Sequence, residues 1–349
     1  MLTLQTYTKK KKAICFFDTF VYQIIRMQNI AIIMGGYSSE VEISLKSGNV
    51  VFNNLNRDHY SPFRVHILKE KWVALDDNST EYPINKHDFS TEINGKKITF
   101  DCVFNAIHGN PGENGVILAY FKLLGIKHTS APFYQMALTF NKRDTLSVVK
   151  AYGIKTATSI YLNEGDTINE DAIFKKVGLP CFVKPNNAGS SFGISKVSKK
   201  EQLTEALKTA FKEDSEILIE SFLDGTEVSI GVIEYEGKVK VLAPTEIVTE
   251  NDFFDYEAKY LGKSQEITPA RISEQKLQNV NAAAAHVYKV LGMKGFSRAE
   301  YIFIGDEPYF LEINTVPGLT TESLLPMQAK VAGISLTDLF GNAIEEALS

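Results

Sequence analysis

The feature that most constrains the fold is a short apolar run that stops abruptly at two glycines. Residues 30–34 are all apolar, and Gly35 and Gly36 follow at once. A continuous apolar run of this length is typical of a strand buried on both faces, as in a parallel sheet. A helical pattern of apolar residues then extends from about Ser44 to Leu55. A buried strand that leads through glycines into a helix predicts an α/β unit.

Strand and helix patterns continue along the chain and divide it into three regions. In residues 29–130 we expect a small parallel sheet, with strands at 30–34, 63–69 and 98–108 and helices at 44–55 and 115–124. In residues 131–222 we expect helices at 142–152 and 201–212 and strands at 181–184, 194–197 and 216–222. In residues 223–349 we expect hairpins at 227–245 and 296–314, a helix at 273–292 and two final helices. The whole is an α/β (α+β) protein of three domains.

Composition narrows the functional classes. The 349 residues are 44% hydrophobic and 23% charged, with a net charge of −5, so no basic surplus points to nucleic acid as a partner. No apolar run is long enough to cross a bilayer. The three cysteines, Cys15, Cys102 and Cys181, are too far apart for a zinc site and odd in number, so a reducing cytoplasm fits best.

The first 28 residues differ from the rest. Lys9–Lys12 and the apolar residues after them resemble a signal peptide, but Asp18 interrupts the stretch and no small-residue cleavage site follows. We therefore expect a peripheral extension, with Met27 as a candidate start of the natural protein.

The hairpin at 296–314 is the most informative segment for chemistry. Residues two apart in a strand share a face, so Arg298 and Glu300 point the same way, as do Glu312 and Asn314. If the turn pairs Ile304 with Pro308, Glu300 faces Glu312. Facing carboxylates repel each other, but a Mg²⁺ ion between them makes the arrangement favourable, because Mg²⁺ takes carboxylate, phosphate and water oxygens as ligands. The alternative is a salt network in which Arg298 neutralises both acids.

A second segment, residues 184–193, lies between two predicted strands and is rich in glycine, serine and asparagine. Such a loop can direct backbone N–H groups at a phosphate, and Lys184 can add a charge. It does not match the Walker pattern, and an ordinary flexible loop has a similar composition.

Three other segments carry weaker signals. Glu220 ends an apolar strand and Glu227 begins the next, which suits nucleotide binding but, taken alone, is better explained by a solvated interdomain linker. Glu40 lies at a strand-to-helix turn that can hold a ligand. The alternative is that this turn only caps the helix, with Ser39 or Ser44 as the N-cap. His108 lies in a similar glycine-rich turn, where histidine is more often a turn residue than a catalyst.

Taken in order, these segments resemble the D-alanine–D-alanine ligases of the ATP-grasp superfamily. The likeness extends from Ile30 to the C-terminus and leaves out the residues before Met27. It implies the ATP-grasp fold, with ATP between the central and C-terminal domains and a lid at residues 249–264. It also implies joining of two D-alanines through D-alanyl phosphate for peptidoglycan. ATP is then a substrate, two Mg²⁺ ions are cofactors for which Mn²⁺ can substitute, and the protein is a cytoplasmic homodimer without nucleic-acid or membrane partners.

The resemblance also implies a role for each matching residue. The ATP phosphates are assigned to Lys142, Lys184, Ser190, Ser191 and Lys259, and adenine and ribose to Glu220, Leu223 and Glu227. The Mg²⁺ ligands are Glu300, Glu312 and Asn314, and the oxyanion donors are Arg298 and the Gly318 backbone. The ammonium of the first D-alanine is assigned to Glu40, linked through Ser190 to Tyr260, with His108 close by. The second D-alanine is assigned to Ser323 and Leu324.

Two positions refine this expectation. The first metal ligand of the family is usually Asp, and the longer Glu300 leaves monodentate and bidentate binding of Mg²⁺ both open. Relatives that make D-alanyl-D-lactate lack the lid tyrosine, so Tyr260 predicts the dipeptide as product.

Two rival functions remain at this stage. Another ATP-grasp ligase would share Lys184 and Glu312 but not the segments around Glu40 and His108 or Tyr260. A nucleotide-binding regulatory protein without catalysis would be expected to lack metal ligands or Arg298, whereas the full set is present here.

Overall fold

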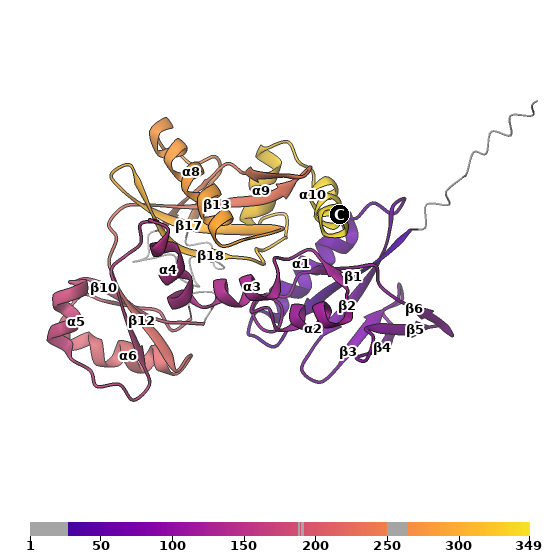
Figure 1. The fold of residues 1–349 in the computed structure, drawn as a ribbon, viewed down its shortest axis with the longest axis horizontal. Helices are drawn as coiled ribbons and strands as arrows, with labels where there is room; N and C mark the ends of the chain where they lie inside the picture. Colours follow the sequence, from indigo (N-terminus) through magenta and orange to yellow (C-terminus); the bar gives the residue numbers. More distant parts are fainter. Residues whose placement is uncertain (1–26, 188, 190–191, 250–263) are drawn as a thin grey trace, which may run out of the picture.

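The computed structural model describes residues 27–187, 189, 192–249 and 264–349, arranged as three sheets with flanking helices (Figure 1). The expected extension at 1–26 and the expected lid residues 250–263 lie outside this range. In the described part of the chain, no helix is both long and apolar enough to cross a membrane.

The first sheet has eight strands in the order β6-β5-β4-β3-β2-β1-β7-β8. Its parallel half was predicted in part and comprises β1 (Gln28–Gly35), β2 (Tyr60–Ile67), β7 (Cys102–Asn105) and β8 (Lys127–His128). The antiparallel half was not predicted and comprises β3 (Trp72–Leu75), β4 (Glu81–Asn85), β5 (Ser90–Ile93) and β6 (Lys96–Ile98). The expected parallel sheet is therefore present as one half of a larger mixed sheet. The four antiparallel strands were missed because these short and partly polar strands carry no clear apolar period.

Helix α1 (Val41–Asn54) begins three residues before the predicted start, and neither Ser39 nor Ser44 caps it. The N-cap is Glu40, which makes no side-chain cap bond, and Ser44 lies inside the helix. Helix α1 packs closely on β1: a Cβ added to Gly48 would lie 2.6 Å from Met34 Cε, so this contact requires glycine. Helix α2 (Val116–Leu124) ends at the left-handed Gly125, as predicted.

The second sheet is antiparallel, in the order β11-β10-β12-β9. Its strands are β9 (Ser159–Asn163), β10 (Cys181–Pro185), β11 (Ser195–Val197) and β12 (Glu216–Ser221). Helices α5 (Glu170–Val177) and α6 (Leu203–Phe211) pack on it and form a core of their own with β10 and β12. Helices α3 (Phe133–Phe140) and α4 (Lys142–Ala151) connect it to the first sheet (Figure 1).

The third sheet is also antiparallel and contains the two predicted hairpins. Its strands are β13 (Thr226–Tyr235), β14 (Lys238–Val241), β15 (Thr245–Thr249), β16 (Ser264–Ile267), β17 (Phe296–Ile304) and β18 (Glu307–Asn314). The first hairpin turns at Glu236-Gly237 as predicted, but β14 ends four residues early and Thr245 begins a separate strand. Helix α8 (Glu274–Val290) has the predicted Ser273 N-cap, whose side chain accepts from Lys276 N–H.

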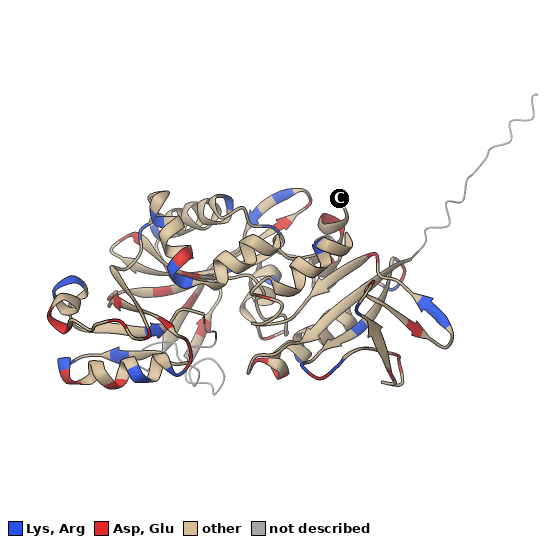
Figure 2. Ribbon diagram, turned by 60° about the horizontal axis from the view of Figure 1, so that its bottom comes forward, with Lys and Arg blue, Asp and Glu red and all other residues tan. Residues whose placement is uncertain are grey.

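The last helices, α9 (Leu324–Val331) and α10 (Leu336–Leu348), join the third sheet to the first. Apolar residues of α10, such as Phe340 and Ile344, share one buried cluster with Ile32 of β1 and Phe104 of β7. The two ends of the described chain therefore pack on each other. Cys102 and Cys181 are buried free thiols. Figure 2 shows acidic and basic residues interspersed along the ribbon, in keeping with the small net charge.

Candidate active site

The hairpin of β17 and β18 contains an irregularity that brings two acids together. At the turn, Ile304 pairs with Glu307 and not with Pro308, so the predicted turn register is wrong by one residue. A β-bulge then leaves Leu311 unpaired, and Glu300 faces Glu312 as predicted. Because facing residues of a ladder point to the same side, this single extra residue places both carboxylates on one face.

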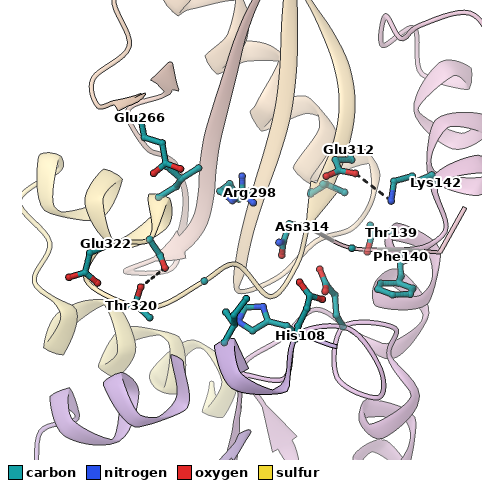
Figure 3. A pocket seen from close by; sticks show the side chains of 18 residues that line it. His108, Thr139, Phe140, Lys142, Glu266, Arg298, Glu312, Asn314, Thr320 and Glu322 are labelled. Atoms are coloured by element: carbon teal, nitrogen blue, oxygen red, sulfur yellow. Dashed lines mark hydrogen bonds and ion pairs between the residues drawn. The ribbon is translucent and has the colours of Figure 1, made fainter. Parts of the chain in front are cut away.

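Cations from two elements lie against these carboxylates. Arg298 Nη1 lies 2.6 Å from Glu300 Oε1 and donates to Ser229 Oγ at 2.8 Å. Lys142 Nζ, in the first turn of α4, lies 3.5 Å from Glu312 Oε2 (Figure 3). Burial opposes the charge on Arg298, but Glu300 outweighs burial, so the pKa of Arg298 is raised and the guanidinium stays charged.

The donor atoms on this face fit a hard divalent cation. Mg²⁺ binds through oxygen, commonly with one or two carboxylates beside phosphate and water. Asn314 faces Arg298, and its Oδ1 accepts from Val316 N–H at 3.0 Å, which fixes the amide and leaves a second lone pair. Among the described residues, no group of three or more His, Cys, Asp or Glu could hold a metal. Both sequence interpretations, a shared metal site and a salt network, match these contacts.

Lys184 of β10 and Glu220 of β12 form a buried ion pair. The pair continues into a chain of polar contacts, because Ser159 Oγ lies 3.2 Å from Glu220 Oε1 and accepts from Lys150 Nζ at 3.3 Å. Burial would lower the pKa of Lys184, but Glu220 reverses the shift and raises it. The lysine is therefore held in its charged form, which is the form that binds phosphate.

A cavity of about 350 Å³ lies in front of the hairpin face (Figure 3). It is lined by residues of the first sheet's loops, of α4, of the loop after β10 and of the third sheet. Nine of the predicted site residues line it: Glu40, His108, Lys142, Arg298, Glu312, Asn314, Gly318, Ser323 and Leu324. The prediction missed other lining residues: Ile43, Glu113, Thr139, Phe140, Gly189, Glu266, Ile313, Thr320 and Glu322.

The other predicted residues fall into two groups. Lys184, Glu220, Leu223, Glu227 and Glu300 do not line this cavity. Leu223 lies between β12 and β13, and Glu227 is in β13, where it pairs with Ile302 of β17. Ser190, Ser191, Lys259 and Tyr260 lie outside the described residues.

Glu40, at the start of α1, lies where two glycine-rich loops meet. A Cβ added to Gly189, in the loop after β10, would lie 3.0 Å from Glu40 Oε2. A Cβ added to Gly109, in the loop after β7, would lie 3.5 Å from the same oxygen. The carboxylate of Glu40 therefore lies against the backbone of both loops, in contact with the cavity.

His108 is buried at the boundary between the first sheet and the third. Its Nε2 lies 3.2 Å from Ser47 Oγ, and the ring lies near the backbone carbonyl of Val316. Burial lowers the pKa of His108, so the ring is neutral near pH 7.

Glu113 is the most informative residue that the sequence prediction missed. Its Oε2 accepts from Gly109 N–H at 3.0 Å, and the backbone N–H of Thr315 lies near its carboxylate. Burial first, and then the nearby charge of Glu40, raise the pKa of Glu113 to about 7. The sequence shows only a glutamate in a glycine-rich turn and carries no signal of the surroundings that shift its pKa.

Replacing Glu113 by glutamine is expected to make the free energy of unfolding less dependent on pH. The pKa of this carboxyl is 4.5 when unperturbed and about 7 in the folded protein, so the folded state binds the proton more tightly. The wild type therefore loses stability as the pH rises from 5 towards 8, by about 2 kcal/mol more than Glu113→Gln. Urea unfolding of the ligand-free proteins at both pH values measures this difference.

Glu322→Gln is the matched control, because Glu322 lines the same cavity but is exposed and has a lowered pKa. Above pH 5, the free energy of unfolding of Glu322→Gln should depend on pH as it does in the wild type. Equal dependence in all three proteins would contradict the raised pKa of Glu113.

Comparisons with known proteins define the class to which this site belongs. The chain matches the VanG D-Ala:D-Ser ligase of Enterococcus faecalis at 31% identity, over 92% of this chain and 100% of that one, with a TM-score of 0.81. It matches the D-alanine–D-alanine ligase of Bacillus anthracis complexed with ATP at 28% identity, over 92% and 97%, with a TM-score of 0.74. The fold is therefore the ATP-grasp fold of carboxylate–amine ligases.

The sequence comparisons are more specific. Residues 29–131 match the family described as D-ala D-ala ligase N-terminus, and residues 148–345 match D-ala D-ala ligase C-terminus. The D-alanine–D-alanine ligase of Flavobacterium johnsoniae is 67% identical over 323 residues, which cover 93% of this chain and 100% of that protein. The chain belongs to the D-alanine–D-alanine ligase family, as its sequence motifs predicted.

Proposed function

We propose that this protein joins two molecules of D-alanine into D-alanyl-D-alanine for peptidoglycan precursors, with conversion of ATP to ADP and phosphate. The observation that carries the proposal is the face of β17 and β18, where Arg298, Glu312 and Asn314 line one cavity together with Lys142. The 67% identity to a D-alanine–D-alanine ligase and the ATP complex of a structural relative support the same substrates.

In the first half-reaction, a carboxylate oxygen of one D-alanine attacks the γ-phosphorus of ATP and ADP leaves. Such a transfer asks the protein mainly for positioning and for neutralisation of phosphate charge. Lys142 and the buried Lys184 supply positive charge at fixed positions. Glu300, Glu312 and Asn314 would hold Mg²⁺, which neutralises phosphate oxygens when bound.

In the second half-reaction, the neutral amine of the second D-alanine attacks the carbonyl carbon of the acyl phosphate and a tetrahedral oxyanion forms. Its collapse breaks the C–O bond to phosphate, which leaves, and the nitrogen loses a proton to give the peptide bond. Arg298 is held by Ser229 and Glu300 through one nitrogen, and its guanidinium carries further N–H groups. We assign the oxyanion to Arg298 and the Gly318 backbone N–H. A Cβ on Gly318 would lie 2.7 Å from Ser323 Oγ, so glycine allows this backbone to approach the residue assigned to the second substrate.

The two amino acids would bind at opposite sides of this centre. Glu40 is a carboxylate in contact with the cavity, which suits the ammonium of the first D-alanine. Ser323 and Leu324 line the other side at the N-terminus of α9, where backbone N–H groups suit the carboxylate of the second. Tyr260, which matches the lid tyrosine of the family, supports an amine over a hydroxyl as the nucleophile.

An assay of phosphate release tests the function directly. Folded protein with Mg·ATP is expected to release phosphate with D-alanine and not with L-alanine, and to form the dipeptide detected by mass spectrometry. Mixtures of D-alanine with D-serine or D-lactate should give mainly D-alanyl-D-alanine near neutral pH. Absence of D-alanine-dependent release would refute the proposal, and comparable incorporation of D-lactate would refute the specificity.

Three finer features are proposed on the same basis. The domains would span residues 29–130, 131–222 and 223–349, and the protein would act in the cytoplasm. It would also be a homodimer, which the exposed Val116 and Leu123 on one face of α2 could support. A monomer mass by light scattering at micromolar concentration would contradict the dimer.

A further inference from the structure

The segment from Thr315 to Leu319 follows Asn314 and contains Gly318, the assigned oxyanion donor. It lies in the C-terminal region, residues 223–349, yet three side chains from the N-terminal region, residues 29–130, contact it. The carboxylate of Glu113 lies near the Thr315 N–H, the ring of His108 lies near the Val316 carbonyl, and Ser47 Oγ accepts from Leu319 N–H at 3.3 Å.

Ser47 links two of these three contacts. It lies in α1 with no exposed surface, and its Oγ is within 3.2 Å of His108 Nε2 as well as bonded to Leu319 N–H. The Ser47 hydroxyl therefore accepts from Leu319 N–H and shares a hydrogen bond with His108 Nε2, whose direction depends on the tautomer of the ring.

We propose that Ser47 is a positioning residue of the ligase reaction. Its hydroxyl fixes the backbone N–H next to Gly318 and orients the His108 ring that holds Val316. The Gly318 N–H is thereby fixed from both sides in the direction of the reacting carbonyl. This inference rests on the proposed function, because it takes the Gly318 N–H as an oxyanion donor.

A second serine of α1 provides a matched control. Ser44 lies one turn earlier and is equally buried, and its Oγ accepts from Gly35 N–H at 2.8 Å and donates to the Ala106 carbonyl at 2.7 Å. Both of these bonds stay within the first sheet's part of the chain. Ser44→Ala and Ser47→Ala therefore remove the same buried hydroxyl from the same helix, but only Ser47→Ala releases the Gly318 segment.

The test compares kcat, KM for ATP and inhibition by a dipeptide analogue with a phosphinate in place of the peptide carbonyl. For Ser47→Ala we expect kcat to fall about tenfold, less than the 10²–10³ that loss of a whole oxyanion donor costs. Binding of the tetrahedral analogue should weaken by about the same factor, because both depend on the transition-state geometry. KM for ATP should not change. Ser44→Ala should keep the wild-type kcat and analogue affinity.

The outcomes separate this inference from the proposed function. If the wild type makes no D-alanyl-D-alanine, the proposed function fails first. If the wild type is active and Ser47→Ala loses no more kcat and analogue affinity than Ser44→Ala, the positioning role of Ser47 is refuted. Should Ser47→Ala not fold, Ser47→Cys keeps the volume with a weak hydrogen-bonding group, and the same comparison applies to it.

Discussion

Replacing Arg298 by alanine is expected to lower kcat for dipeptide formation by about 10²–10³, the usual effect of losing one donor to an oxyanion. The side chain lines the cavity while Ser229 and Glu300 hold it in place, and the proposed function assigns its remaining N–H groups to the oxyanion. KM for ATP should change little, because the loss falls on the transition state of the second half-reaction. Steady-state kinetics with varied ATP at saturating D-alanine measure both quantities.

Arg298→Ala also leaves the buried carboxylate of Glu300 without its partner, which costs about 3–5 kcal/mol in comparable buried pairs. Arg298→Lys separates the two effects. It keeps a positive charge beside Glu300, but an ammonium lacks the planar fork of a guanidinium. We expect Arg298→Lys to fold with near-wild-type stability and still lose most of kcat. Wild-type kcat in this variant would exclude the oxyanion role of Arg298.

Replacing Glu312 by glutamine is expected to lower dipeptide formation by about 10² or more. The bulge at Leu311 brings the Glu312 carboxylate opposite Glu300, and Lys142 Nζ lies 3.5 Å from its Oε2. Glutamine keeps the shape of the side chain but removes the negative charge of a proposed Mg²⁺ ligand, and charge neutralisation dominates phosphoryl transfer. Steady-state kinetics at varied Mg²⁺ concentration measure the loss.

Glu322→Gln is the control for this substitution, since Glu322 lines the same cavity but is exposed and is not among the proposed Mg²⁺ ligands. It should keep most of the wild-type kcat, whereas Glu312→Gln should lose activity and require more Mg²⁺. Circular dichroism and thermal unfolding establish that both proteins are folded. A folded Glu312→Gln protein with wild-type activity and wild-type Mg²⁺ dependence would refute the metal role of Glu312.

The sequence pattern alone predicted an element correctly wherever that element depends on residues close together in the chain. The buried strand β1 was predicted because a run of apolar side chains without alternation can only be covered on both faces. The Ser273 cap of α8 and the left-handed Gly125 after α2 were predicted for similar reasons, since each depends on its own neighbours. The strands β3 to β6 were missed because their short, mixed sequences gain stability from pairing with the rest of the sheet.

The sequence by itself determined the chemistry available to this protein. Arg298, Glu300, Glu312 and Asn314 occur at strand spacing, and their order with the other segments was enough to predict the family. The identity of a side chain and the two-residue spacing along a strand are local properties, so both can be read from the sequence without knowing what packs against the strand.

Only the tertiary structure decided how these groups are used. The bulge at Leu311, the Lys184–Glu220 pair and the raised pKa of Glu113 all depend on which distant segments meet. The same is true of Ser47, whose contact with Leu319 joins residues 272 positions apart. Burial, charge and hydrogen-bond geometry arise from that meeting, because each is a property of the surroundings of a residue and not of its neighbours in the sequence.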